Sequence, residues 1–492
     1  MRIPLDRQSE TPLYQQIETY LRQAILSGNL SAGTRLPAAR QLAHDLGVNR
    51  STVENAYSTL EADGLVFSRM GSGTYVLEQD ILSNAPEHDS RTHLPLWQQN
   101  FHTSKTVSTS ELVEGMLKAG GHPRPINFAS GVSDVREFPA EEFRKTLQSV
   151  MRRDQIGALE YGEPNGYGPL REGIAHILAS QGLQTRPESI LITAGSQQAI
   201  FLASQVLLKP NDTVLVESPT YSAAMDLFRT LGFQIVGVPM DNQGMQVDQL
   251  EKLLQQHHPK LIYTIPNFHN PTGTCLSSAR RRQLIVLAER YNVPILEDDF
   301  VGDLRYEGHA QPSLKALDPG GQVIYVSTFS KMLVPGLRVG FIVADGPVYE
   351  SLLNYKRLSD LATSTLIQRT LDAFVTVGRY QTYLHRSSQI FRKRRDAMLK
   401  AIECHLPAKV SFDIPSGGLF IWLRLPNGMS ANELLSIACK EGVAFVPGSH
   451  FFIDHANGAE WMRLNFVSQP VEDIEEGIKR LGMAIRKLKT RR

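Results

Sequence analysis

Apolar residues follow two different patterns along this chain of 492 residues. Between residues 11 and 60 they recur at helical spacing, whereas from residue 190 onward they form short continuous runs. Helical spacing predicts amphipathic helices, and short apolar runs between helices predict the strands of a mainly parallel sheet that is covered on both faces. At about 150 residues per domain, the length suggests roughly three folding units.

The first pattern predicts a helix-turn-helix followed by a hairpin. One helix begins near Thr11 and stops at Gly28, a second, short helix ends at Gly47, and a third follows. The apolar segments 65–70 and 74–76 flank a turn of glycine and serine, which predicts a hairpin that would form a wing. The residues expected to face the core are Tyr14, Ile17, Leu21, Ala24, Ile25, Leu42, Ala43, Leu46, Val53, Ala56, Tyr57 and Leu60.

The polar face of the third helix is typical of a recognition helix in the major groove of DNA. Its start is capped either by Asn49 or by a capping box of Ser51 and Glu54. Since seven arginines balance seven acidic residues up to residue 76, a small helical domain for protein contacts is the alternative. The candidates for contact with double-stranded DNA are Arg35, Arg40, Arg50, Ser51, Thr52, Asn55, Arg69 and Gly73.

This N-terminal stretch resembles the GntR family of winged-helix regulators over nearly all of residues 11–76. The matching runs are Gly33 to Pro37, Arg40 to Ala43, Leu46 to Val48, Arg50 to Val53, Leu60 to Leu65 and Gly71 to Val76. The resemblance implies a DNA-binding domain over residues 1–77. Ala38 and Ala39 depart from the family, which more often has a serine before Arg40, and this costs one phosphate contact.

Composition excludes several other classes of protein. The formal net charge of +1 identifies no partner, no apolar run approaches the roughly 18 residues that span a bilayer, and the N-terminus lacks the apolar core of a signal peptide. Cys275, Cys404 and Cys439 are widely separated, which indicates neither a disulfide framework nor a metal site. We therefore expect a cytoplasmic protein, with a polar linker over residues 78–125 that is partly ordered around 112–117.

In residues 126–492, polar groups follow the predicted strands. The strand 323–326 leads to Thr328, Ser330 and Lys331, and a lysine amine at the edge of an apolar site can form an imine with an aldehyde. Taken alone, a lysine after a strand is more often an ordinary exposed side chain. Arg338 could pair with an anion beside Lys331. Ser196, where a strand meets a helix, could hold a phosphate or only start the helix.

Three further strand ends carry groups that fit a flat pyridine ring. Tyr221 could stack on the ring or merely pack, and Asn270 could donate to a ring oxygen or only form a turn. Asp298 follows a buried strand and needs a charged partner, which a protonated pyridine nitrogen would provide. One ligand explains all these groups together: pyridoxal 5'-phosphate (PLP), with its imine at Lys331 and its phosphate near Ser196, Thr328, Ser330 and Arg338.

The body resembles the class I aminotransferases of PLP fold type I over most of residues 126–470, with the motifs in that family's order. The resemblance implies that Gln197 joins the phosphate cup, that Arg463 binds a substrate carboxylate, and that Gly131 lies near that carboxylate. It also implies that Tyr161 reaches the phosphate of a partner subunit, and hence a dimer. Family members usually have a tyrosine where this chain has Phe300 or Val301, so full transaminase turnover stays an open question.

Together the two resemblances match the MocR subfamily of bacterial regulators. The sequence predicts an α/β protein in which a winged helix precedes an aminotransferase-like body with a smaller C-terminal α+β domain. The resemblance implies a head-to-tail homodimer that senses an amino-acid or amine effector through aldimine exchange at Lys331. One alternative is a working aminotransferase that carries a DNA-binding head. Another, a body that has lost PLP, is disfavoured by Asn270, Asp298, Lys331 and Arg338.

Overall fold

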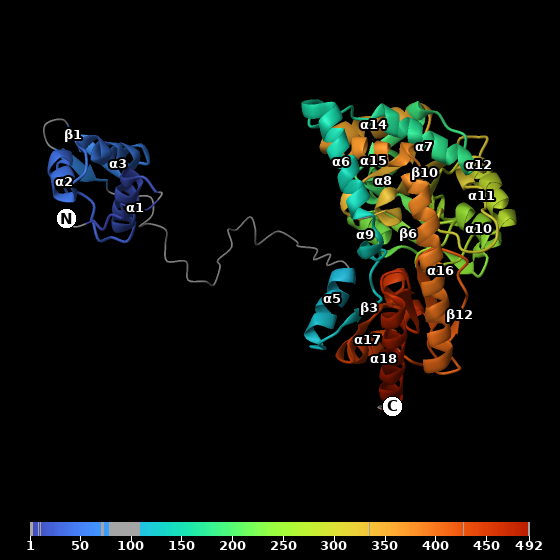
Figure 1. The fold of residues 1–492 in the computed structure, drawn as a ribbon. Helices are drawn as coiled ribbons and strands as arrows, with labels where there is room; N and C mark the ends of the chain where they lie inside the picture. The colour runs from blue at the N-terminus through green and yellow to red at the C-terminus, as the bar shows by residue number, and fades with distance from the viewer. Residues whose placement is uncertain are drawn as a thin grey trace. The chain divides into compact units, whose positions relative to one another are not determined.

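The computed structural model describes residues 3–7, 9, 11–69, 73–77, 109–333, 335–426 and 428–490. The chain divides into two compact units, Met1–Ser104 and Lys105–Arg492 (Figure 1). We call residues 3–77 the head and residues 109–490 the body, and their hydrophobic cores are separate. Within the described ranges, no helix is long and apolar enough to cross a membrane.

The head is the predicted winged helix. It consists of α1 (Leu13–Leu26), α2 (Ala39–Leu46), α3 (Arg50–Ala62) and the antiparallel strands β1 (Val66–Arg69) and β2 (Gly73–Val76). Gly47 ends α2 with φ +61°, a left-handed conformation that suits glycine. Ile17, Leu21, Val53 and Leu60 are fully buried between the helices, so the apolar stripes of α1 and α3 form the core. The predicted turn residues Gly71 and Ser72 lie outside the described residues.

The body is organised around an eight-stranded sheet of order β4-β11-β10-β9-β8-β5-β6-β7. The strands β10, β9, β8, β5 and β6 pair in parallel, which confirms a mainly parallel sheet, whereas β11 runs antiparallel to both of its neighbours. The bounds are β4 Ile190–Thr193, β5 Thr213–Ser218, β6 Gln234–Asp241, β7 Gly244–Met245, β8 Leu261–Thr264, β9 Ile295–Asp298, β10 Val323–Thr328 and β11 Gly340–Val343.

Both faces of this sheet are covered, as the continuous apolar runs predict. Successive residues of one strand enter different cores: Leu215 of β5 packs with α10 and α11, and Val216 packs with the larger core on the other face. The helices of this part are α6 Ala140–Asp154, α7 Gly168–Ser180, α8 Ser196–Leu207, α9 Ser222–Thr230, α10 Val247–His257, α11 Ser278–Tyr291, α12 Leu314–Leu317, α13 Phe329–Met332, α14 Gly346–Asp360 and α15 Thr365–Thr376.

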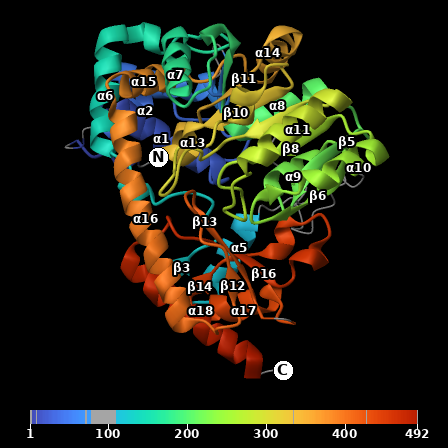
Figure 2. The same ribbon diagram turned by 90° about the vertical axis from the view of Figure 1, so that its right-hand side faces the viewer.

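A long helix, α16 (Arg379–His405), connects the large sheet to a smaller C-terminal domain (Figures 1 and 2). This domain has a four-stranded sheet of order β12-β13-β16-β15, and β14 pairs in parallel with β3, which precedes the large domain. The bounds are β3 Ile126–Asn127, β12 Ser411–Phe412, β13 Phe420–Arg424, α17 Ala431–Lys440, β14 Val443–Ala444, β15 Val446–Pro447, β16 Trp461–Asn465 and α18 Val471–Thr490.

The interval 78–125, predicted as a linker, includes a helix of the body. This helix, α5 (Thr109–Ala119), buries Val113 and Leu117 in the large core and packs on α17. Both residues lie in the segment 112–117, for which the sequence predicts partial order. Residues 78–108 lie outside the described residues.

Candidate functional site

Lys331 lies on α13, the single helical turn that follows β10. Its Nζ donates a hydrogen bond of 3.0 Å to the carbonyl oxygen of Gly131. Burial, together with the positive charges of Arg463 and Arg338, lowers the pKa of the Lys331 amine to about 8. An amine with such a pKa is unprotonated in an appreciable fraction of molecules near neutral pH, which is the form that attacks a carbonyl carbon.

A cavity of about 190 Å³ opens beside this amine at the carboxyl ends of the strands. Such a position is where open α/β sheets bind ligands. Of the residues that the sequence singled out for the cofactor and the effector, seven line the cavity: Gly131, Ser196, Tyr221, Asn270, Asp298, Lys331 and Arg463. Burial raises the pKa of the Tyr221 hydroxyl to about 12, so this ring stays neutral.

Asp298, the last residue of β9, has one oxygen without a partner. The hydroxyl of Tyr263 donates to Oδ2 at 2.8 Å, whereas Oδ1 is buried and has no hydrogen bond. Burial raises the pKa of Asp298 to about 7, since removal from water disfavours the charged form. The sequence patterns did not identify Tyr263 as a site residue. It lies in β8, an apolar strand that pairs with β9, so its hydroxyl can reach the end of β9.

A second group of residues lies around the start of α8. Gly195 precedes this helix with φ +97°, and a Cβ there would lie 2.8 Å from a guanidinium nitrogen of Arg338. Arg338 itself donates to the carbonyl of Ala194 at 2.8 Å. The hydroxyl of Ser330 is buried without a partner, whereas Thr328 Oγ1 donates to a backbone carbonyl at 3.0 Å and accepts the Ser330 amide. Arg338, Ser330 and the helix N-terminus thus offer donors to an anion.

The sequence patterns did not identify the side chains that hold Ala194 and Gly195, the residues between β4 and α8. Gln198 Oε1 accepts the Ala194 amide at 2.7 Å, and its Nε2 donates to Asp360 at 3.0 Å. Asp360 in turn pairs at 2.6 Å with Lys356, whose side chain is fully buried. Gln197, the residue predicted for the phosphate cup, donates from Nε2 to a backbone carbonyl of α9 at 3.3 Å. No local pattern connects Gln198 with Asp360, because they are far apart in the sequence.

Arg463, on β16, is buried where the small domain meets the cavity. It donates from one terminal nitrogen to Asn270 Oδ1 at 2.8 Å and from the other to the carbonyl of Ala129 at 3.0 Å. Its Nε is buried without a partner. The guanidinium lies over the rings of Phe420 and Phe451, at 4.2 and 5.0 Å from their centroids. Burial lowers its pKa, yet a guanidinium keeps its charge in proteins, so Arg463 remains a cation that needs an anion.

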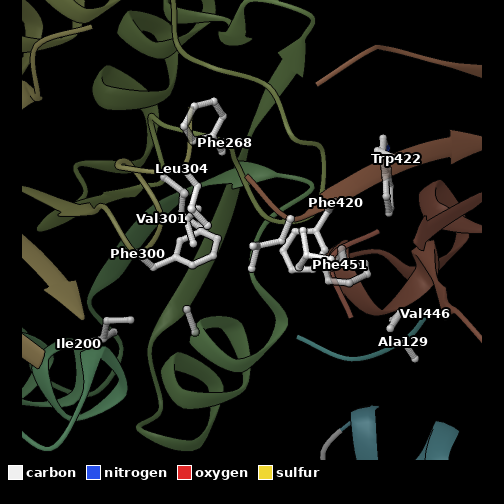
Figure 3. Close-up of a cluster of buried hydrophobic side chains, with 14 of the residues drawn as sticks. Ala129, Ile200, Phe268, Phe300, Val301, Leu304, Phe420, Trp422, Val446 and Phe451 are labelled. Atoms are coloured by element: carbon white, nitrogen blue, oxygen red, sulfur yellow. The ribbon is translucent and has the colours of Figure 1, made fainter. Parts of the chain in front are cut away.

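Two aromatic residues differ sharply in their exposure. Phe300 is 6% exposed and lines the cavity from the large domain, in one apolar cluster with Phe420 and Phe451 (Figure 3). Tyr161 is 90% exposed, so it does not contribute to the cavity of its own chain.

Among the described residues, no cluster of His, Cys, Asp or Glu is suited to a metal ion.

In the head, the predicted DNA-contacting residues lie at the surface. Asn49 occupies the N-cap position of α3 without a side-chain bond, and Glu54 pairs with Arg50 at 2.7 Å in place of the capping box. Arg35 forms an isolated bridge with Tyr75 of the wing and lies next to Gly73. The exposed candidates are Arg35, Arg40, Arg50, Ser51, Asn55 and Arg69, while Thr52 and Gly73 are partly buried.

The chain matches two families of known proteins. Residues 123–481 match the family "Aminotransferase class I and II", and residues 13–76 match "Bacterial regulatory proteins, gntR family". The uncharacterized HTH-type transcriptional regulator YdfD of Bacillus subtilis is 32% identical over 99% of this chain and 98% of its own length. Aromatic-amino-acid aminotransferase 1 of Thermococcus litoralis is 38% identical over 77% of this chain and 92% of its own.

A solved structure supports the same assignment. The crystal structure of LysN, an alpha-aminoadipate aminotransferase from Thermus thermophilus, superposes on 80% of this chain and 100% of its own, with a TM-score of 0.73 and 34% identity. The fold of the body is thus PLP fold type I, as the sequence predicts. The chain belongs to the aminotransferase class I and II family, and because a gntR-type DNA-binding region precedes that domain, it is a transcriptional regulator of the MocR kind.

Proposed function

We propose that the body binds PLP at Lys331 and senses an amino acid or a similar amine there, and that the head changes its binding to double-stranded DNA in response. One observation carries this proposal. A lysine whose pKa is lowered by burial and by two arginines shares a cavity with a buried carboxylate oxygen that lacks a partner, in a chain that also has a regulatory head.

The residues present fit PLP. Asp298 Oδ1 is an unpartnered acceptor for a protonated pyridine nitrogen, and Ser330 Oγ is an unpartnered donor for a phosphate oxygen. Gly195 leaves room beside Arg338 where any larger residue would collide. When bound, PLP supplies an aldehyde carbon that forms an imine with a primary amine. The LysN structure contains a phosphopyridoxyl derivative of leucine, which supports the same ligand class here.

The effector would use two groups of this chain. Its amine would take the place of the Lys331 amine at the cofactor, and its carboxylate would pair with Arg463, whose Nε has no partner. PLP alone offers no carboxylate to Arg463, so occupancy by PLP and by effector differ at this residue. Such a difference is needed, since a ligand shifts a conformational equilibrium only by its differential affinity for the two states.

We also propose that the protein acts as a head-to-tail homodimer in the cytoplasm. Tyr161 is 90% exposed, and a partner subunit's cavity would give this ring a buried site. Further large apolar side chains of the body are more than half exposed, and contact with a partner subunit would remove those at the interface from water. Among these residues are Ile156, Leu159, Leu358 and Leu361.

The rival function is transamination. It is favoured by the 38% identity to an aminotransferase and opposed by Phe300, which places a ring without a hydroxyl in the cavity. The test is a paired measurement on the PLP-loaded protein: visible absorbance on mixing with amino acids, and a DNA-binding titration with and without the same compounds. We expect an amino acid that changes the absorbance also to change DNA affinity. Lys331→Ala and Arg463→Ala should still bind DNA but lose the response.

Rapid multiple-turnover conversion of an amino acid and a 2-oxo acid, with unchanged DNA affinity, would establish the rival function instead.

A further inference from the structure

A short segment of the body reaches the cavity at Gly131 and contacts both Lys331 and Arg463. We call residues 128–134 the strap. Its ends are tied to the chain that follows Arg463: Asn465 N donates to the Phe128 carbonyl at 2.9 Å, and Asp134 N donates to the Val467 carbonyl at 3.1 Å. The strap therefore has fixed ends, and the position of its middle decides what it presents to the cavity.

The side chain of Asn465 makes two hydrogen bonds to the middle of the strap. Its Nδ2 donates to the carbonyls of Ser130 and Val132, both at 2.8 Å, and its Oδ1 accepts the amides of Val467 and Ser468 at 2.8 and 3.1 Å. Asn465 is fully buried, so these four bonds use the whole hydrogen-bonding capacity of the amide without water. The two strap acceptors flank Gly131 on either side.

This arrangement fixes two carbonyl groups that bond to side chains lining the cavity. The Gly131 carbonyl accepts from Lys331 Nζ, and the Ala129 carbonyl accepts from Arg463, each at 3.0 Å. In the proposed function the effector's amine would take the place of the Lys331 amine, and its carboxylate would pair with Arg463. The Ala129 carbonyl therefore competes with the effector's carboxylate for Arg463. No local sequence pattern indicates either contact, because Gly131 and Lys331 are 200 residues apart and Ala129 and Arg463 are 334 apart.

We propose that Asn465 is a positioning residue, which acts by holding the strap against Lys331 and Arg463, so that an effector carboxylate must displace the Ala129 carbonyl to bind. The role of the displaced strap rests on the proposed function, whereas the positioning by Asn465 does not. In the order of the chain, α5 and then β3 lie between the head and the strap, so the strap is the part of the candidate site that is nearest in sequence to the head.

The Asn465→Asp variant removes the donor group of this side chain and keeps its acceptor oxygen. Aspartate keeps the acceptor for Val467 and Ser468 but can donate at most one of the two bonds to the strap, and only when it is protonated. In this variant, hydrogen exchange followed by mass spectrometry should show faster exchange in a peptide covering residues 128–134, with little change in residues 466–468. Asn465→Ala should speed exchange in both.

Gln368→Ala is the matched control. Gln368 is also a buried amide that bonds to two backbone groups, the Tyr167 amide and the Thr363 carbonyl, both at 2.8 Å and both outside the strap. Its loss should leave exchange of the strap unchanged. Unaltered strap exchange in both Asn465 variants would overturn the positioning role.

The competition is tested with propionate, which has a carboxylate but no amine, by a ligand-observed NMR titration. Because the Asn465→Asp variant loses bonds to the strap, it should bind propionate about twofold to tenfold more tightly than wild type, which corresponds to the net contribution of one hydrogen bond. Weaker or equal binding in Asn465→Asp, beside a loosened strap, would refute the competition. If propionate binds neither protein, Arg463 is no carboxylate site and the proposed function fails, while strap exchange still decides the role of Asn465.

Discussion

Replacing Asp298 by asparagine should stabilise the cofactor-free protein at pH 8 and at the same time weaken its binding of PLP. The side chain is 2% exposed, and its Oδ1 has no partner, so an ionised Asp298 is costly until a cation arrives. Asparagine keeps an oxygen for the hydroxyl of Tyr263 but carries no charge. The same change therefore removes an unfavourable charge from the empty site and a favourable partner from the filled one.

The size of the stabilisation follows from the pKa of Asp298, which burial raises from its usual 3.8 to about 7. The folded state holds this proton more tightly than the unfolded state, so stability of the cofactor-free wild type falls as the pH rises from about 4 to about 7. At about 1.4 kcal/mol per pKa unit, the penalty reaches an upper limit of about 4 kcal/mol at pH 8. The Asp298→Asn substitution should abolish this part of the pH dependence.

The loss on the cofactor side follows from the pair that Asp298 would form with the pyridine nitrogen. Removing one partner of a buried ion pair costs about 3–5 kcal/mol, which corresponds to PLP binding weaker by between about 100-fold and several thousand-fold. Denaturant unfolding of the cofactor-free protein at pH 5 and pH 8, and a PLP titration, measure the two effects. Asp303→Asn is the control, because burial raises the pKa of Asp303 to about 6, yet this residue does not line the cavity.

Asp303→Asn should therefore change the pH dependence of stability while PLP affinity stays the same. Unchanged PLP affinity in Asp298→Asn, or a cofactor-free variant that is less stable than wild type at pH 8, would refute this account of the site.

Three further outcomes are expected. Lys331→Ala should abolish the pyridoxyl adduct formed on borohydride reduction, and a peptide map that places this adduct on another lysine would contradict the assignment. Arg50→Ala should weaken specific DNA protection in footprinting, with log affinity falling linearly with log salt as phosphate counterions are released; unchanged protection would argue against α3 as the recognition helix. Phe300→Tyr adds a hydroxyl in the cavity and should lower the midpoint of the change in visible absorbance when the PLP-loaded protein is titrated with pH, whereas Phe300→Leu should leave this midpoint unchanged.

The direction of β11 shows what the apolar pattern alone leaves open. The run Val339 to Val343 is one of the short apolar runs that predict strands, and the structure has β11 at Gly340–Val343. Periodicity says nothing of strand direction, but chain length does: β10 ends at Thr328, and the eleven residues between the strands are too few for an ordinary parallel crossover. The antiparallel pairing could thus have been predicted.

β6, in contrast, had a weak signal. Gln234–Asp241 contains Gly237 and Pro239, and most of its side chains are only partly buried, because it lies next to the edge of the sheet. Residues of that kind do not form the continuous apolar run that predicts β4, β5, β8, β9, β10 and β11. The candidate site shows a similar division, since strand ends identified Lys331 and Asp298, whereas the supporting Asn465 depends on contacts between distant segments.

The charges around the cavity explain why such a body could serve as a sensor without efficient catalysis. Lys331, Arg338 and Arg463 bring three cationic groups to a site whose buried carboxylate, Asp298, has a raised pKa, so the charges are poorly balanced within the chain itself. A phosphate would balance Arg338, and only a further anion would balance Arg463. Until that anion arrives, the strap carbonyl of Ala129 is a neutral substitute, which is weaker than a carboxylate. In the proposed function, the free energy for a conformational change would come from exchanging a neutral acceptor for a charged one, and this exchange requires binding but no turnover.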